Sequence, residues 1–182
     1  MHRIAKGSYF LLLCFSVLAF SCEAKVFYSK QEAMTLAFGE QAKVEMLSLF
    51  PKKAQQTAIE GLARVKMNSP LFTFYVAKKD GQIQAYAAIE TRNVRTKPET
   101  LLVVLNAQGQ LIKVETLAFH EPPEYLPPAR WFAQLFNLPL DELSFGAGVQ
   151  GISGATLSTR AGLDTVRKVL AIYQVMIAEA GR

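Results

Sequence analysis

The pattern of hydrophobic and polar positions predicts an α+β fold that begins with a helix. Ser29-Lys30-Gln31-Glu32 has the form of a helix capping box. The apolar residues Ala33, Leu36 and Ala37 follow it at helical spacing and predict a buried helix face. Residues 42–60 surround Pro51 and fit either a helix or an extended segment, so their structure is left open.

Four apolar segments in the middle of the chain predict β-strands joined as hairpins. We expect the strands at residues 71–77, 83–90, 101–105 and 111–117. Lys79-Asp80-Gly81 separates the first pair and Asn106-Ala107-Gln108-Gly109 separates the second, and both are turn signals. Apolar and charged side chains alternate over residues 112–116, which predicts a sheet with one covered face.

The last third of the chain predicts helices. A proline-marked loop at 121–128 is followed by a short helical segment at 130–136. Apolar residues then recur at helical spacing, at Leu163, Val166, Val169, Leu170, Tyr173, Met176 and Ile177. The expected fold is therefore an antiparallel sheet of hairpins packed by helices, with a C-terminal helix after a loop rich in Gly, Ser and Thr.

The N-terminus has the layout of a secretory signal peptide. Arg3 and Lys6 precede an apolar run at 9–20, and Ser21-Cys22-Glu23-Ala24 provides a cleavage site after Ala24. The run is shorter than the roughly 20 residues that a membrane-spanning helix needs. We therefore expect a signal peptide at 1–24, one domain at 25–182, and a periplasmic or otherwise extracytoplasmic location. An uncleaved anchor and a lipoprotein processed at Cys22 are the less favoured alternatives.

Composition narrows the chemistry that the exported domain can perform. The chain has 20 Lys and Arg against 15 Asp and Glu, and this modest, scattered excess does not indicate nucleic-acid binding. Both cysteines, Cys14 and Cys22, fall in the expected signal peptide, and His120 is the only histidine beyond it. Disulfides, haem attachment, iron–sulfur clusters and zinc or other metal sites are therefore not expected. Any redox role would require an organic cofactor.

A loop of small residues precedes the predicted C-terminal helix. Residues 146–159 contain four glycines and four Ser or Thr residues. Small residues let backbone N–H groups approach a ligand, and a helix N-terminus carries partial positive charge, so the segment suits a phosphate group. The alternative is a simple N-cap cluster, in which Ser158 or Thr159 satisfies the first amides of the helix.

Within this loop, Ser153-Gly154-Ala155-Thr156-Leu157-Ser158 closely resembles the flavinylation motif of the FMN-binding domain family. That family includes the flavin subunits of the sodium-pumping NADH:quinone reductase and of the Rnf complex. The resemblance extends over residues 80–177, in the order of two hairpins, a loop, the motif and a helix. It implies that a flavin transferase uses FAD to attach FMN covalently, through its phosphate, to Thr156.

The resemblance also implies which residues surround the cofactor. Gly154 and Ala155 would keep the approach to Thr156 open. Ser153 and Ser158 would donate hydrogen bonds to the phosphate, and Leu157 would pack under the flavin ring. His120-Glu121-Pro122-Pro123 matches part of a family loop that contacts the flavin.

Four further positions need comment. His120 would face the flavin or play a structural role. Tyr125 and Trp131 would stack on the ring or pack within the proline loop. Gln150 stands where the family motif has Asp, which keeps hydrogen-bonding capacity but removes a charge.

The predicted function is that of an exported electron carrier, more a redox subunit than a stand-alone enzyme, with no catalytic residue of its own. Expected partners are the flavin transferase and a membrane redox complex, or an exported haem or flavin protein. One alternative is the same fold with flavin bound non-covalently, or a redox-inactive interaction module. A serine hydrolase using Ser153, His120 and Glu121 is disfavoured, because the glycines around Ser153 do not match the GxSxG spacing.

Overall fold

A computed structural model of the chain describes residues 25–179, so the expected signal peptide lies outside the described residues. The helices and strands follow the order β1 (Lys25–Val26), α1 (Lys30–Phe38), β2 (Lys43–Leu49), α2 (Lys53–Ala63), β3 (Phe72–Lys79), β4 (Gln82–Asn93), β5 (Pro98–Asn106), β6 (Leu111–Phe119), α3 (Ala129–Phe132) and α4 (Thr156–Tyr173). Short 3-10 turns lie at Pro123–Tyr125 and Ala133–Leu135, and a π-helical turn at Gln174–Ala178 extends α4.

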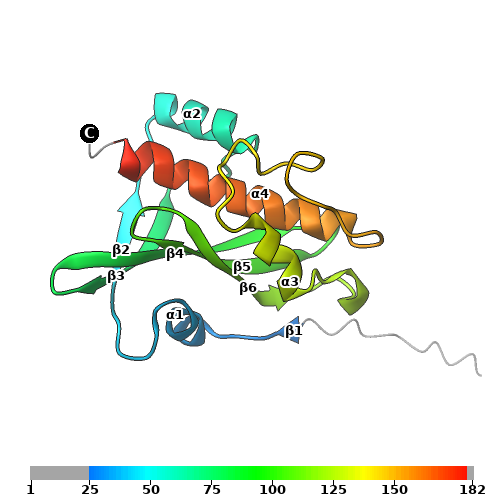
Figure 1. The fold of residues 1–182 in the computed structure, drawn as a ribbon, viewed down its shortest axis with the longest axis horizontal. Coiled ribbons are helices and arrows are strands. Elements are labelled where there is room, and N and C mark those ends of the chain that lie inside the picture. Colours follow the sequence, from blue (N-terminus) through cyan, green and yellow to red (C-terminus); the bar gives the residue numbers. More distant parts are fainter. Residues whose placement is uncertain (1–24, 180–182) are drawn as a thin grey trace, which may run out of the picture.

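The strands form one six-stranded antiparallel sheet in the order β1-β6-β5-β4-β3-β2 (Figure 1). The predicted hairpins are present as β3–β4 and β5–β6. β4 and β5 also pair along nine residue positions, from Ala85↔Asn106 to Asn93↔Pro98. The predicted α+β class, with an antiparallel sheet and a C-terminal helix after the glycine-rich loop, is confirmed.

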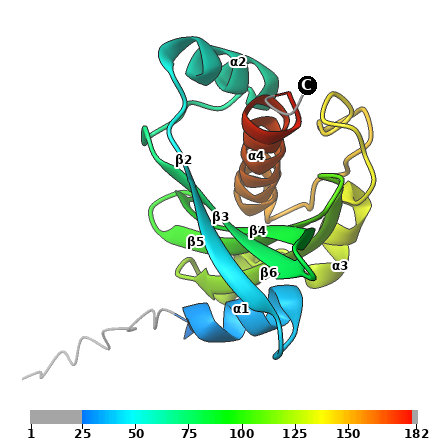
Figure 2. The same ribbon diagram turned by 90° about the vertical axis from the view of Figure 1, so that its left-hand side faces the viewer.

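The sheet is covered on both faces, so the prediction of one covered face was wrong. Figures 1 and 2 show α2 and α4 on one side of the sheet and α1 on the other. Residues 101–105 of β5 are all buried, with Leu101 and Val103 in the core under α4 and Leu102 in the core under α1. A strand that is buried on both faces has a continuous run of apolar residues, as β5 does. The alternation in β6, which lies between β5 and the short edge strand β1, did not reveal that the second face of the sheet is covered.

The two segments around Pro51 resolve into different elements. Residues 43–49 form the edge strand β2, and residues 53–63 form α2, with Pro51 in the break between them. The predicted capping box of α1 is confirmed, because Glu32 N donates to Ser29 Oγ and Ser29 N donates to Glu32 Oε2. The short helix expected at 130–136 is α3 followed by a 3-10 turn.

Contacts along α4 join this helix to α3, α2 and the loop at 143. A Cβ on Gly162 would come 2.9 Å from the ring of Phe132, so this glycine lets α3 pack directly against α4. Farther along, the buried guanidinium of Arg167 donates to Ala63 O at 2.8 Å, to Leu62 O at 2.9 Å and to Leu143 O. These hydrogen bonds join α4 to the end of α2 and to the loop that leads back to the motif.

Among residues 25–179, no helix combines the length and the apolar character that crossing a membrane requires.

Candidate functional site

The motif threonine is the first residue of the long helix α4. Thr156 is exposed, and its Oγ1 donates to Ile152 O at 3.3 Å. Gly154 has φ +85°, a conformation that favours glycine, and this residue turns the loop into the helix. The N-cap position is Ala155, whose side chain cannot accept a hydrogen bond from the first turn. The start of α4 therefore offers backbone donors to a ligand and an accessible hydroxyl beside them.

A pocket of about 240 Å³ lies against this helix start. Its walls come from three separate segments: the turn between β4 and β5, the proline loop and the motif. The lining residues are Val94, Arg95, Glu121, Tyr125, Gly154, Ala155, Thr156, Leu157 and Ser158. Leu157 and Tyr125 are 49% and 37% exposed, so they present apolar surface at the pocket. Six of the eight predicted cofactor-binding residues thus lie together, the exceptions being Ser153 and His120.

The hydroxyl of Ser158 is the least satisfied group in this pocket. Ser158 is 1% exposed, and its Oγ has no hydrogen-bond partner among the described residues. Buried polar atoms without a partner are rare and costly, and they often mark the place of a ligand or water. Thr159, by contrast, donates to the carbonyls of Ala155 and Thr156, both at 3.1 Å. Neither hydroxyl caps the first amides of α4, so the N-cap alternative was wrong.

Glu121 lines the pocket, but one of its carboxylate oxygens is taken up by the protein itself. Oε1 accepts hydrogen bonds from three consecutive backbone amides, Arg95 N at 3.1 Å, Thr96 N at 2.7 Å and Lys97 N at 2.8 Å. The Lys97 and Thr96 amides hold the pKa of Glu121 below its ordinary value. Glu121 is therefore a charged carboxylate that fixes the turn at residues 94–97.

Two predicted residues lie outside the pocket lining. Ser153 is exposed in the loop before Gly154. His120 follows β6, and its backbone N–H donates to Pro98 O at 3.1 Å, which continues the pairing of β5 and β6. Oε1 of the Glu121 carboxylate accepts from the backbone of the turn, and Ser153 lies outside the pocket that Glu121 lines, so the structure does not bring Ser153 and Glu121 together as a hydrolase would need.

Trp131 is buried and is hydrogen-bonded to the backbone of the motif loop. Its ring is 6% exposed, and its Nε1 donates to Gln150 O at 2.6 Å. The side chain of Gln134 also accepts from Gln150 N at 2.8 Å and donates to Gln150 O at 3.3 Å. Of the two alternatives for Trp131, the structure favours packing within the loop. Gln150 is thus held by its backbone, with its own side chain exposed.

Sequence reasoning missed one charged residue that lines the pocket, Arg95, and one buried carboxyl group in the sheet, Glu99. Arg95 reaches the pocket only because the β4–β5 hairpin places its turn beside the start of α4, and no motif indicated this. Glu99 on β5 is 1% exposed with neither carboxylate oxygen hydrogen-bonded among the described residues. Burial raises its pKa to about 8, partly offset by the positive charge of Arg92. Its position in a strand of apolar residues gave no sign of its burial.

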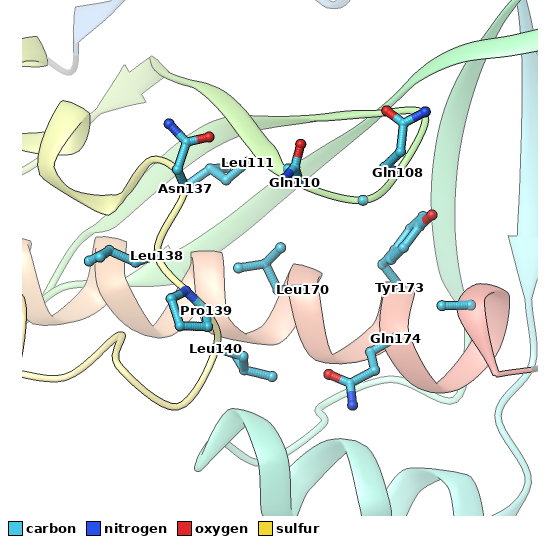
Figure 3. Close-up of a pocket in the computed structure, with 12 residues that line it drawn as sticks. Gln108, Gln110, Leu111, Asn137, Leu138, Pro139, Leu140, Leu170, Tyr173 and Gln174 are labelled. Atoms are coloured by element: carbon cyan, nitrogen blue, oxygen red, sulfur yellow. The ribbon is translucent and has the colours of Figure 1, made fainter.

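A second pocket, of about 380 Å³, lies at the opposite end of α4 (Figure 3). Figure 3 shows Leu170 and Tyr173 extending from α4 toward the β5–β6 turn, which carries Gln108 and Gln110. Leu111 and residues 137–140 complete its walls, and none of the lining residues is an acid or a base other than the Tyr173 phenol. This pocket presents carboxamides and apolar groups, with no cationic or anionic group for a charged ligand.

The part of the chain that the structure describes contains no group of three or more His, Cys, Asp or Glu side chains placed to hold a metal ion. In comparisons with known proteins, no family model, no curated protein and no solved structure matches this chain.

Proposed function

We propose that this protein is an exported electron carrier that holds one FMN through a phosphoester bond to Thr156. One arrangement carries the proposal: the exposed Thr156 hydroxyl, the uncapped start of α4 and the buried, unpartnered hydroxyl of Ser158 all border the same pocket. The resemblance of residues 153–158 to the flavinylation motif supplies the identity of the ligand.

The attachment transfers the FMN half of FAD to Thr156 and requires no oxidant or reductant. Thr156 Oγ1 forms a bond to the phosphorus of the FMN half of FAD. The bond from that phosphorus to the AMP half breaks, AMP leaves, and the threonine proton passes to the flavin transferase or to water. The transferase supplies the catalysis, so this chain needs to offer only an accessible hydroxyl, and Thr156 is exposed.

The residues present fit the product of this reaction. A phosphodiester carries one negative charge, which the partial positive charge and free amides of a helix N-terminus stabilise. Ser158 Oγ lies beside these amides and has a hydrogen bond to donate. Leu157 and Tyr125 offer exposed apolar surfaces on which an aromatic ring system packs.

When bound, FMN supplies one- or two-electron transfer through its ring system. This chain would hold the cofactor and exchange electrons with partners rather than transform a substrate. The proposed partners are a membrane redox complex, or an exported haem or flavin protein. A covalent bond suits such a carrier, because a non-covalent cofactor would be diluted outside the cell.

The test is in-gel fluorescence of the exported protein from cells that co-express a flavin transferase. We expect a fluorescent band for the wild type after denaturation, and a mass increased by one FMN less one water. Thr156→Val should abolish both signals. Thr57→Val is a matched control, because Thr57 is also exposed in a helix and also donates to a carbonyl four residues earlier, Lys53 O at 3.0 Å.

A dark wild-type band, with the transferase active on another substrate, would overturn covalent attachment. The protein would then bind flavin non-covalently or serve as a redox-inactive module. Gln150→Asp sharpens that outcome: a bright variant beside a dark wild type would identify Gln150 as the residue that prevents recognition by the transferase.

A further inference from the structure

The turn between β4 and β5 brings an uncommitted positive charge to the pocket. Arg95 is exposed and lines the pocket, and its guanidinium makes no ion pair or hydrogen bond within residues 25–179. Nearby cations differ in this respect. Arg92 pairs with Asp164 at 3.5 Å, and Lys168 pairs with Glu90 at 2.5 Å. Arg95 is thus available for an anionic ligand, whereas Arg92 and Lys168 hold β4 against α4.

The turn that carries Arg95 is held by several hydrogen bonds. The three consecutive amides of residues 95–97 converge on Glu121 Oε1, and Thr96 Oγ1 adds a contact at 3.4 Å. Val94 N also donates to Lys97 O at 3.0 Å, which closes the turn. Glu121 itself is 7% exposed. A charged acceptor for several amides gives strong hydrogen bonds, so the backbone of this turn is rigid.

Another wall of the pocket is the start of α4, with its backbone donors and the Ser158 hydroxyl, which has no partner among residues 25–179. Arg95 and Glu121 are the only charged residues in the pocket lining. Glu121 keeps its negative charge, with Oε1 directed to the amides of the turn, and the groups in the lining that attract an anion are the cationic side chain of Arg95 and the helix N-terminus.

We propose that Arg95 binds the phosphate group of the flavin together with the start of α4, and that Glu121 is the positioning residue that fixes Arg95 there. This inference rests on the proposed function for the identity of the ligand. It also changes the role expected for Glu121, from a contact with the flavin to a support for the turn. The phosphate would lie between a guanidinium, which suits phosphate oxygens, and the amides of the helix start.

The first test uses the folded protein produced without a transferase, titrated with FMN and with riboflavin. These probes share the ring and differ by the phosphate, and flavin fluorescence reports binding of both. We expect the wild type to prefer FMN. Arg95→Met should weaken FMN binding about tenfold or more and leave riboflavin binding unchanged. Arg130→Met removes an exposed arginine outside the pocket lining and should change neither affinity.

The second test separates positioning from general support of the fold. Glu121→Gln should lower the preference for FMN over riboflavin, whereas a merely structural loss would weaken both flavins alike. In the Arg95→Met background, Glu121→Gln should have no further effect on this ratio, because the side chain that it positions is gone. Glu121→Asp, which keeps the charge, should recover part of the preference. Thermal unfolding of each variant verifies that the protein is folded.

Three outcomes would overturn the inference. One is equal binding of FMN and riboflavin by the wild type, and another is an Arg95→Met variant that keeps the full preference for FMN. The third is a changed midpoint potential of the flavin bound to Arg95→Met, with the preference for FMN retained. That result would place Arg95 at the flavin ring. A preference that depends on Arg95 without any modification of Thr156 would leave this inference standing and remove the covalent attachment. If Thr156 is modified and the preference for FMN does not depend on Arg95, the covalent attachment stands and this inference is overturned.

Discussion

The two ends of α4 border two pockets with different chemistry. At its start, the smaller pocket combines a helix N-terminus, the uncommitted Arg95 and the unpartnered hydroxyl of Ser158. At its end, the larger pocket in Figure 3 is lined by carboxamides and apolar groups, and the Tyr173 hydroxyl already donates to Ala107 O at 3.2 Å. Under the proposed function the site is the smaller pocket, which unsatisfied donors and a free charge distinguish and which its volume does not.

The largest expected effect concerns the buried carboxyl group of Glu99, in the strand β5 that passes under α4. Glu99 keeps its proton in the folded state up to a pKa of about 8, whereas the unfolded chain releases it near 4.5. The free energy of unfolding should therefore fall as pH rises between these values, and be flat above them. Glu99→Gln removes this slope, so the variant should be more stable than the wild type at pH 9, on the order of 4 kcal/mol.

Chemical denaturation at pH 4 and pH 9 measures this difference. The two proteins should have similar stability at pH 4, where the carboxyl group is protonated in both states. Glu124→Gln, at an exposed glutamate, is the matched control and should leave the pH dependence of the wild type intact. Parallel pH profiles for Glu99→Gln and the wild type would mean that Glu99 is ionised and solvated in the folded protein.

The next effect tests the packing at the other end of the helix. A Cβ on Gly109 would lie 2.0 Å from the Tyr173 ring, and φ at this glycine is +81°. That ring cannot simply move away, because it packs edge-on against Tyr86 with ring centroids 5.1 Å apart. Gly109→Ala should lower the free energy of unfolding by about 3 kcal/mol, through overpacking and backbone strain together. Equilibrium denaturation in urea measures it.

The smallest effect is expected for the corresponding glycine-to-alanine substitution at the start of α4, at Gly154. Gly154 has a similar φ of +85°, but a Cβ there would meet no atom within 4 Å. Gly154→Ala should therefore cost only the backbone strain, about 1 kcal/mol. An equal loss of stability in the two variants, measured side by side in urea, would show that the packing of Tyr173 contributes nothing to the difference.

Much of the fold could be predicted from local patterns. The capping box at Ser29, the two hairpin turns and the apolar stripe of the C-terminal helix each act through neighbours in the sequence, and the structure has all of them. The coverage of the second sheet face could not be predicted in this way. It depends on α1 crossing under β5, which is a long-range contact that periodicity does not record.

The sequence by itself determined the motif and the place of Thr156 at the start of a long helix, because small residues and hydroxyls at fixed spacing mark a loop that enters a helix. Only the tertiary structure decided which distant residues border that loop. Arg95 and Glu121 come to it because antiparallel pairing of β4, β5 and β6 brings one turn and one strand end to the same edge. Burial of Ser158 and Glu99 is likewise a product of packing, since each is a polar residue whose environment is set by elements far away in the chain.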